Sequence, residues 1–157
     1  MMDAADLPAD YYATRPATVD CVIAAARRQR VPANVLLAIA SVEAGRHGQV
    51  RANRDGSVDL GQFQINSVHL PRLARYGIRA DDLRLRGCYA AELAGWMLAN
   101  EVRRGGRGDW WSRAARYHSA TPYYNAVYRS RLIAAADVWG RWLARHYPVE
   151  VAWAGVQ

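Results

Sequence analysis

The sequence predicts one mainly α-helical domain that carries a single small, irregular β-hairpin. The chain has 157 residues, which fits one domain and is long enough to bury a core without a metal ion. Apolar residues recur at helical spacing in most segments between turn residues. Residues 50–66 break that spacing, and Asp55-Gly56 within them is a hairpin signal.

The first two helices are predicted over residues 18–30 and 33–44. Thr18 or Asp20 can cap the first helix, because a side-chain oxygen there accepts a backbone N–H of the first turn. Pro32 suits the first turn of the second helix, and Gly45 follows that helix as a stop signal. The second helix is strongly apolar and is therefore predicted to be buried. Glu43 lies in its last turn.

The remaining helices are predicted at about 66–76, 88–103, 109–117 and 122–146. Asp109 is the cap of the third of these, and Thr121-Pro122 begins the last. Gly77 and Gly105 follow helices as stops, and Asp81-Asp82 is predicted as a turn.

The termini are predicted to differ from the domain between them. Residues 1–17 show little periodicity and are predicted as a loose N-terminal arm, and residues 148–157 as a C-terminal tail. The domain then covers residues 18–147. No apolar leader follows Met1, and no apolar stretch reaches the length of a membrane span.

All 21 basic residues are arginine, and the net charge is +7. The arginines are scattered without a run of five like charges, so we interpret most of them as a solvated surface. A general preference for an acidic polymer is the alternative. A nucleic-acid-binding module would gather arginines on one exposed helix, and no nucleic-acid partner is predicted. No metal or nucleotide motif is present, so no cofactor is predicted.

Glu43 is the first candidate for chemistry. Its neighbours Ile39, Ala40 and Val42 are apolar, so we expect its carboxyl to be partly desolvated. Desolvation disfavours the charged form and raises the pKa, which makes a carboxyl a proton donor near neutral pH. The alternative is a glutamate at an exposed helix end, a position that the helix dipole disfavours.

Two further segments carry polar and aromatic residues. Residues 59–66 combine Gly61 with two glutamines and Phe63, a composition that suits a sugar-binding groove, although polar loops of this kind are common. Tyr117-His118-Ser119 ends a predicted helix, where the tyrosine could equally be a core residue. For Tyr123, Tyr124 and Tyr128, packing or an exposed amphipathic position is favoured over a saccharide platform.

These segments, in this order, resemble the soluble lytic transglycosylase (SLT) domain family. The resemblance covers about residues 20–135 and is closest to the small accessory transglycosylases of conjugation, secretion and pilus systems. The first motif ends in Glu43, with Ala44 where the family usually has serine. The second motif is matched by Gly61, Phe63, Gln64 and Ile65, with Gln62 at the position of a leucine. Of the third motif, usually Ala-Tyr-Asn-Ala-Gly, only Tyr117 is kept.

The resemblance implies a lysozyme-like fold and a peptidoglycan lytic transglycosylase. It implies that Glu43 is the catalytic acid and that no metal or other cofactor takes part. The substrate-binding residues that it implies are Gly61, Phe63, Gln64, Tyr117, His118 and Ser119. His118 would replace the family's asparagine as a hydrogen-bonding group. Peptidoglycan strands, and possible components of a secretion or conjugation apparatus, are the implied partners of a monomer.

The two cysteines, Cys21 and Cys88, are 67 residues apart, a spacing that argues against a metal site. Composition alone leaves a disulfide and two free thiols equally open. Members of the secretion-linked subgroup often carry cysteines at these two places, so the resemblance implies a disulfide and hence the periplasm. A periplasmic location requires that a leader has been removed from the chain.

Three other functions stay open at this point. A hydrolytic lysozyme on the same fold would need a second carboxylate, and Asp55 or Asp59 could supply it. We interpret both residues first as braces of the turn. The altered third motif also leaves open a non-catalytic scaffold that only binds peptidoglycan. The pI near 9.9 leaves open a DNA-binding module.

Overall fold

A computed structural model describes residues 6–155 of the chain. The helices are α1 (Val19–Gln29), α2 (Ala33–Glu43), α3 (Leu70–Leu73), α4 (Ala80–Leu85), α5 (Gly87–Arg103), α6 (Trp110–Ala114) and α7 (Pro122–His146). Single 3-10 turns lie at Ala9–Tyr12, Ser67–His69, Ala74–Tyr76 and Ala115–Tyr117. The strands β1 (Val50–Ala52), β2 (Val58–Leu60) and β3 (Ile65–Asn66) form an antiparallel sheet in the order β1-β2-β3.

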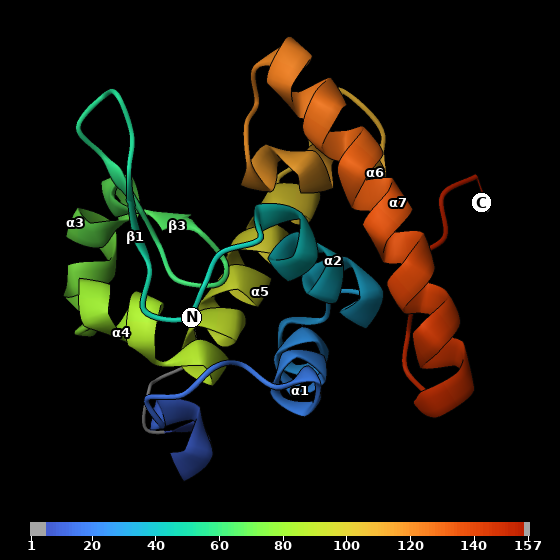
Figure 1. Cartoon of the computed structure of the whole chain (residues 1–157). Coiled ribbons are helices and arrows are strands. Elements are labelled where there is room, and N and C mark those ends of the chain that lie inside the picture. Colours follow the sequence, from blue (N-terminus) through green and yellow to red (C-terminus); the bar gives the residue numbers. More distant parts are fainter. Residues whose placement is uncertain (1–5, 156–157) are drawn as a thin grey trace.

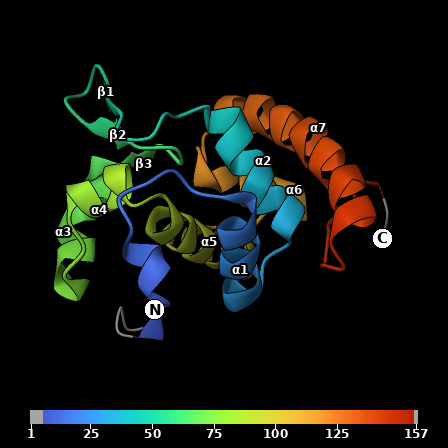
Figure 2. The ribbon, with the colours of Figure 1, turned by 60° about the horizontal axis from the view of Figure 1, so that its bottom comes forward.

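The buried helix α5 lies between two groups of elements (Figure 1). The sheet, α3 and α4 lie on one side of it, and α1, α2, α6 and α7 lie on the other, as the rotated view also shows (Figure 2). This arrangement of a mainly helical domain with a small sheet is lysozyme-like, as predicted. No helix in the described part of the chain is both long and apolar enough to cross a bilayer.

Helix α2 is buried along most of its length. Its seven residues from Ala33 to Ile39 are all buried, and it packs against α1 and α7. Burial of a leucine or isoleucine side chain contributes about 1.5–3 kcal/mol, so the apolar residues of this helix are a main source of stability. Trp139 of α7 donates its indole N–H to the hydroxyl of Ser41 over 2.9 Å, and so fixes the end of α2 that carries Glu43.

The helix starts follow the predicted local chemistry. The hydroxyl of Thr18 accepts the backbone N–H of Cys21 over 3.1 Å at the start of α1. The carboxylate of Asp109 accepts the N–H of Ser112 over 2.8 Å at the start of α6, and Pro122 begins α7. The sheet differs from the prediction in having a third strand, and the turn predicted at residues 81–82 belongs to α4.

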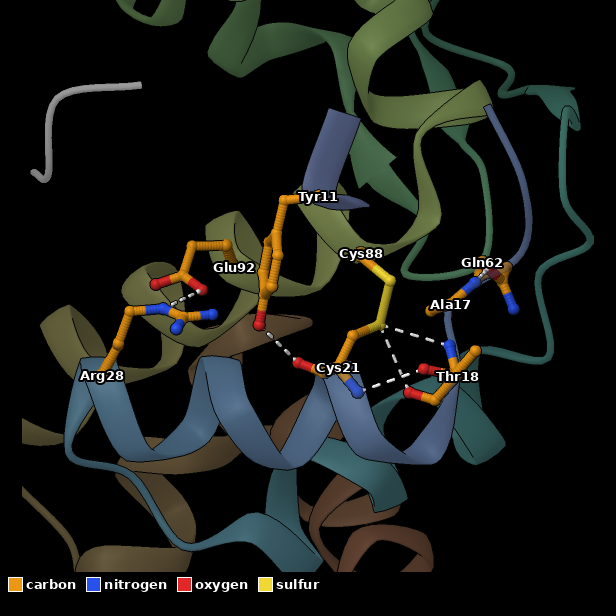
Figure 3. Close-up of a disulfide and its surroundings, with 8 residues drawn as sticks. All are labelled: Tyr11, Ala17, Thr18, Cys21, Arg28, Gln62, Cys88 and Glu92. Atoms are coloured by element: carbon orange, nitrogen blue, oxygen red, sulfur yellow. Dashed lines mark hydrogen bonds and ion pairs between the residues drawn. A yellow bond between two sulfur atoms is a disulfide. The ribbon is translucent and has the colours of Figure 1, made fainter. Parts of the chain in front are cut away.

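The described part of the N-terminal arm is packed against the domain, so the prediction of a loose arm is wrong for residues 6–17. The ring of Tyr11 is buried, and its hydroxyl donates to the carbonyl oxygen of Cys21 over 2.9 Å (Figure 3). The backbone N–H of Ala17 donates to the side-chain oxygen of Gln62 over 2.7 Å. Residues 1–5 lie outside the described residues.

The tail is packed as well. The side chain of Asn34 in α2 is buried and donates to the carbonyl oxygen of Ala152 over 2.7 Å, while the N–H of Ala152 donates back over 2.9 Å. The ring of Trp153 lies against Gly140 of α7. The two hydrogen bonds between Asn34 and Ala152 join residues 118 positions apart, so no local sequence pattern predicts them.

Cys21 and Cys88 form the disulfide that the resemblance implies, with their Cα atoms 5.6 Å apart. It connects the first turn of α1 to the first turn of α5 (Figure 3). Next to it, Glu92 of α5 accepts from the guanidinium of Arg28 over 3.1 Å and from Gln29 over 2.8 Å. The buried carboxylate of Glu92 is therefore paired, as a charge at that depth requires.

Candidate active site

A groove of about 1680 Å³ runs between the two groups of elements. One side is formed by the β1–β2 hairpin, β3 and the start of α3, and the other by the end of α5 and residues 116–124. Glu43, at the last residue of α2, lies among the lining residues. Figure 1 shows the end of α2 between the hairpin and the segment that leads into α7.

The carboxyl of Glu43 has a strongly raised pKa. Its pKa is raised from the ordinary 4.5 to about 7: burial raises the pKa and Tyr128 lowers it, while the nearby Asp59 carboxylate raises it and Arg51 lowers it by smaller amounts. Burial is the largest of these causes, because it removes water from the charged form. A carboxyl with this pKa can both give and take a proton near neutral pH.

Tyr128 of α7 is a buried neighbour of Glu43 that the sequence prediction did not place in the site. Its hydroxyl interacts with the Glu43 carboxyl and thereby lowers the pKa of that carboxyl. The contact falls outside strict hydrogen-bond geometry, and the hydroxyl has no better partner among the described residues. On its other side the Tyr128 ring stacks on His118, with centroids 4.7 Å and planes 6° apart.

Tyr117 connects the helical side of the groove to the turn that follows β2. Its hydroxyl donates to the carbonyl oxygen of Phe63 over 2.9 Å. Burial, followed by the nearby Glu43 and Asp59 carboxyls, holds the pKa of Tyr117 well above its ordinary value. The hydroxyl is therefore neutral and acts as a hydrogen-bond donor.

Residues 61–64 form a tight turn that places Gln64 in the groove. The backbone of Gln64 is left-handed, with φ of 50°, and its side-chain amide donates to the carbonyl oxygen of Gly61 over 2.8 Å. The end of α2 touches this turn closely: a Cβ on Gly45 would lie 2.1 Å from the Gly61 carbonyl oxygen. A residue without a side chain is therefore required at position 45, so that the turn can approach the end of α2. The left-handed residue that ends α2 is not Gly45 but Ala44, with φ of 51°.

Asp59 and Asp55 both brace the hairpin, as the sequence analysis favoured. The two oxygens of Asp59 accept from the side-chain amides of Asn53 over 3.1 Å and Asn66 over 2.9 Å. Asp55 accepts the N–H and hydroxyl of Ser57 at the exposed turn, and these bonds lower the pKa of its carboxyl. Asp59 lines the groove near Glu43, and it is committed to amide donors.

The structure brings most of the predicted site residues to one groove. Those that line it together with Glu43 are Gln64, Tyr117, His118 and Ser119. Phe63 and Gly61 do not line it. The Phe63 side chain is 0% exposed and belongs to the core, so a sugar-stacking role for its ring is wrong, and it serves the site through its backbone carbonyl.

Tyr128 and Arg51 are the two residues near Glu43 that the sequence analysis missed as site residues. Tyr128 shares its spacing with the buried residues Leu132 and Ala136 of α7, so the pattern alone predicts a core position. Within residues 6–155, no three His, Cys, Asp or Glu side chains gather at a distance that suits a metal ion.

The fold is lysozyme-like, and its groove holds a half-buried carboxyl whose pKa is about 7. Together these features define a class of glycan-cleaving proteins. The chain belongs to the transglycosylase SLT domain family, whose match covers residues 20–129. It is 31% identical over 124 residues to "Invasion protein IagB" of Salmonella typhimurium, covering 78% of this chain and 75% of that protein. It is 32% identical over 125 residues to "Protein IpgF" of Shigella flexneri, covering 79% and 80%.

Replacing Gly45 by alanine should destabilise the protein by about 1–3 kcal/mol, the usual effect of overpacking, because the new methyl group meets backbone atoms of the turn. Urea unfolding measures this effect. Ala44→Gly is the matched control, since glycine adopts the left-handed conformation without a Cβ penalty and should unfold no earlier than the wild type. Equal destabilisation by both variants would contradict a specific contact at Gly45.

The raised pKa of Glu43 makes stability depend on pH in a defined direction. The unfolded chain loses this proton near pH 4.5 and the folded protein near pH 7, so the stabilising effect of the protonated form is present below pH 4.5 and is lost as pH rises through 7. The difference in unfolding free energy between Glu43→Gln and the wild type should therefore grow by about 3 kcal/mol from pH 4 to pH 8 in the variant's favour. A difference that does not change with pH would place Glu43 in solvent.

Proposed function

We propose that this protein is a peptidoglycan lytic transglycosylase with Glu43 as its catalytic acid. The observation that carries the proposal is the position of this carboxyl, half-buried in the groove with a pKa of about 7. Membership of the SLT family supports the reaction class. The groove is large enough for several sugar rings, and amide and hydroxyl groups of Gln64, Asn66 and Ser119 line it.

In the proposed reaction Glu43 donates its proton to the glycosidic oxygen between N-acetylmuramic acid and N-acetylglucosamine. The bond from C1 to that oxygen breaks, and the acetamido group of the muramic acid stabilises the cationic centre. Glu43, now a carboxylate, takes the proton of the muramic 6-hydroxyl, whose oxygen forms the new bond to C1. The product is a 1,6-anhydromuramic end, and Glu43 is protonated again. A pKa near the working pH suits both transfers.

The residues around Glu43 are assigned roles in this reaction by their contacts. Tyr128 orients the carboxyl and stabilises its charged form after the first transfer. Tyr117 holds the turn that carries Gln64, and Gln64 lies where it can contact the acetamido group. His118 and Ser119, at the groove surface, take the position of the family's asparagine and alanine as substrate-binding groups.

A hydrolytic lysozyme remains the second candidate, because Asp59 is close enough to raise the pKa of Glu43. A hydrolase of the two-carboxylate type uses its second carboxylate as a base or nucleophile. Both oxygens of Asp59 are occupied by the amides of Asn53 and Asn66, which favours a bracing role. The lyase is therefore preferred.

The proposed setting is the periplasm, where the protein would open the cell wall locally for a secretion or conjugation apparatus. The disulfide is consistent with an oxidising compartment. One relative is named an invasion protein, and its name is the support for a role in such a process. We propose that the protein acts as a monomer on glycan strands.

The decisive experiment is mass spectrometry of the muropeptides released from purified sacculi. The wild type should release products with anhydro ends, and Glu43→Gln should lower the rate by at least about 1000-fold while remaining folded, because the reaction loses its only proton carrier. Asp137→Asn, the same kind of acid-to-amide change at an exposed position of α7 outside the groove lining, is the matched control. Reducing ends would identify a hydrolase, and wild-type lysis by Glu43→Gln would remove Glu43 from the mechanism.

Tyr128→Phe should move the alkaline limb of the pH profile of kcat/KM to higher pH. The Tyr128 hydroxyl lowers the pKa of Glu43, so its removal should raise that pKa. Glu43 then stays protonated to higher pH. Tyr123→Phe is the control, since Tyr123 is 72% exposed and lies on the same helix. An unshifted profile in Tyr128→Phe, measured on solubilised glycan strands, would separate Tyr128 from the titration of Glu43.

A further inference from the structure

The groove is lined by more positive than negative side chains. The arginines among the lining residues are Arg51, Arg54, Arg72, Arg103, Arg104 and Arg116, and the acids are Glu43, Asp55, Asp59 and Glu101. With Glu43 half-titrated near neutral pH, the positive excess is larger than the bare count indicates. The arginines divide into two groups by what their guanidinium groups contact.

The arginines on the helical side of the groove have partners within the chain. Arg104 pairs with Glu101 over 3.0 Å. Arg103 donates to the carbonyl oxygen of Gln29 over 2.8 Å, and Arg116 donates to the carbonyl oxygen of Gly105 over 2.8 Å. These contacts hold the end of α5 and the loop after it, so the guanidinium groups serve the fold.

The arginines on the sheet side, Arg51, Arg54 and Arg72, form no side-chain hydrogen bond or ion pair with any described residue. Arg72 contacts only a ring face, with its guanidinium 5.2 Å from the centre of Trp96. Arg51 lies directly across the strand pair from Asp59, where opposite charges usually attract. The Asp59 carboxylate is bound instead by two asparagine amides, which leaves Arg51 without its natural counter-ion.

Many surface arginines of this chain also lack a partner, as its net charge of +7 requires. The sheet-side group differs in its position, because all three of its members are exposed and line the groove. Arg51 is close enough to Glu43 to influence the pKa of that carboxyl. An anion bound by Arg51 would therefore lie near the reacting bond.

We propose that Arg51, Arg54 and Arg72 form a binding site for the carboxylates of the peptides attached to the glycan strand. The inference rests on the proposed function and names its substrate: strands that still carry their peptides. Each peptide is attached through the lactyl group of muramic acid, the same sugar whose C1 reacts at Glu43. The peptide must therefore leave the groove from a sugar bound next to the acid, so its carboxylates can reach the rim of the groove, and guanidinium groups bind carboxylates in a bidentate geometry.

Binding of a carboxylate at Arg51 has a consequence for Glu43. A free Arg51 lowers the pKa of the Glu43 carboxyl, and a bound anion offsets that positive charge. The acid is then protonated to higher pH when the substrate carries its peptide. Binding of the peptide and protonation of Glu43 are therefore coupled through Arg51.

The test compares three forms of the same strands: with native peptides, with the peptides removed by an amidase, and with the peptide carboxyls converted to amides. The wild type should cleave native strands with a several-fold higher kcat/KM than either other form. The triple variant Arg51→Gln/Arg54→Gln/Arg72→Gln should lose this preference, at about two- to five-fold for each exposed contact. Arg75→Gln, on the turn that follows α3 and outside the groove lining, is the control and should keep the preference.

The amidated strands separate charge from bulk, since their peptides have nearly the same size as the native ones. Equal rates on native and amidated strands, or an unchanged preference in the triple variant, would overturn the proposal. The pH profile gives a second readout, because the alkaline limb of the wild type should lie at higher pH on native strands than on stripped strands. The triple variant should show the same limb on both.

A binding assay distinguishes failure of this inference from failure of the proposed function. Glu43→Gln is mixed with native or amidated sacculi at low and moderate salt, and the bound fraction is measured after sedimentation. Stronger binding to native sacculi that weakens with salt and disappears in the triple variant supports the site even if no lysis occurs. Equal binding to both kinds of sacculi contradicts it even if the wild type releases anhydro ends.

Discussion

The close contact between the end of α2 and the turn at residues 61–64 is the constraint on which the site depends. Because Gly45 has no side chain, the Gly61 carbonyl comes within a distance that any Cβ would forbid. That approach sets the turn that carries Gln64 against the end of the helix that carries Glu43, and both side chains line the groove. The position of the carboxyl, whose burial raises its pKa, therefore depends on backbone packing at Gly45.

Both partners in this contact are held from several directions. Trp139 bonds to Ser41 at the end of α2, and Tyr117 and Ala17 bond to the turn through Phe63 and Gln62. Each bond contributes only about 1 kcal/mol, but together they restrict the positions of a helix end and a loop. The apolar packing of α2 against α7 offsets the cost of keeping an ionisable group half-buried.

The sequence predicts the features that depend on neighbouring residues and misses those that depend on distant ones. Caps at Thr18 and Asp109 were predictable because their partners lie three residues away. The packing of Tyr11 against α1 and of the tail against Asn34 was not, because nothing local encodes it. Phe63 was assigned to the groove because an aromatic among amides resembles a sugar platform, but burial of the ring in the core prevails. Tyr128 was missed because its spacing along α7 is that of a buried core residue, and the spacing does not show that its hydroxyl interacts with Glu43.

The proposed reaction asks one carboxyl to be an acid and then a base, and the surroundings of Glu43 supply opposing influences of the kind this requires. Burial and Asp59 favour the protonated form, whereas Tyr128 and Arg51 favour the carboxylate. If burial acted alone, the proton would be held too tightly for donation to an ether oxygen, and if the donors prevailed, the acid would be ionised before substrate arrived. Tyr117 and Tyr128 keep their own protons, because burial and the nearby Glu43 carboxyl raise the pKa of both hydroxyls. The neutral hydroxyl of Tyr128 can stabilise the carboxylate without competing to transfer a proton, and that of Tyr117 stays bonded to the Phe63 carbonyl, so a single titrating group can serve both steps.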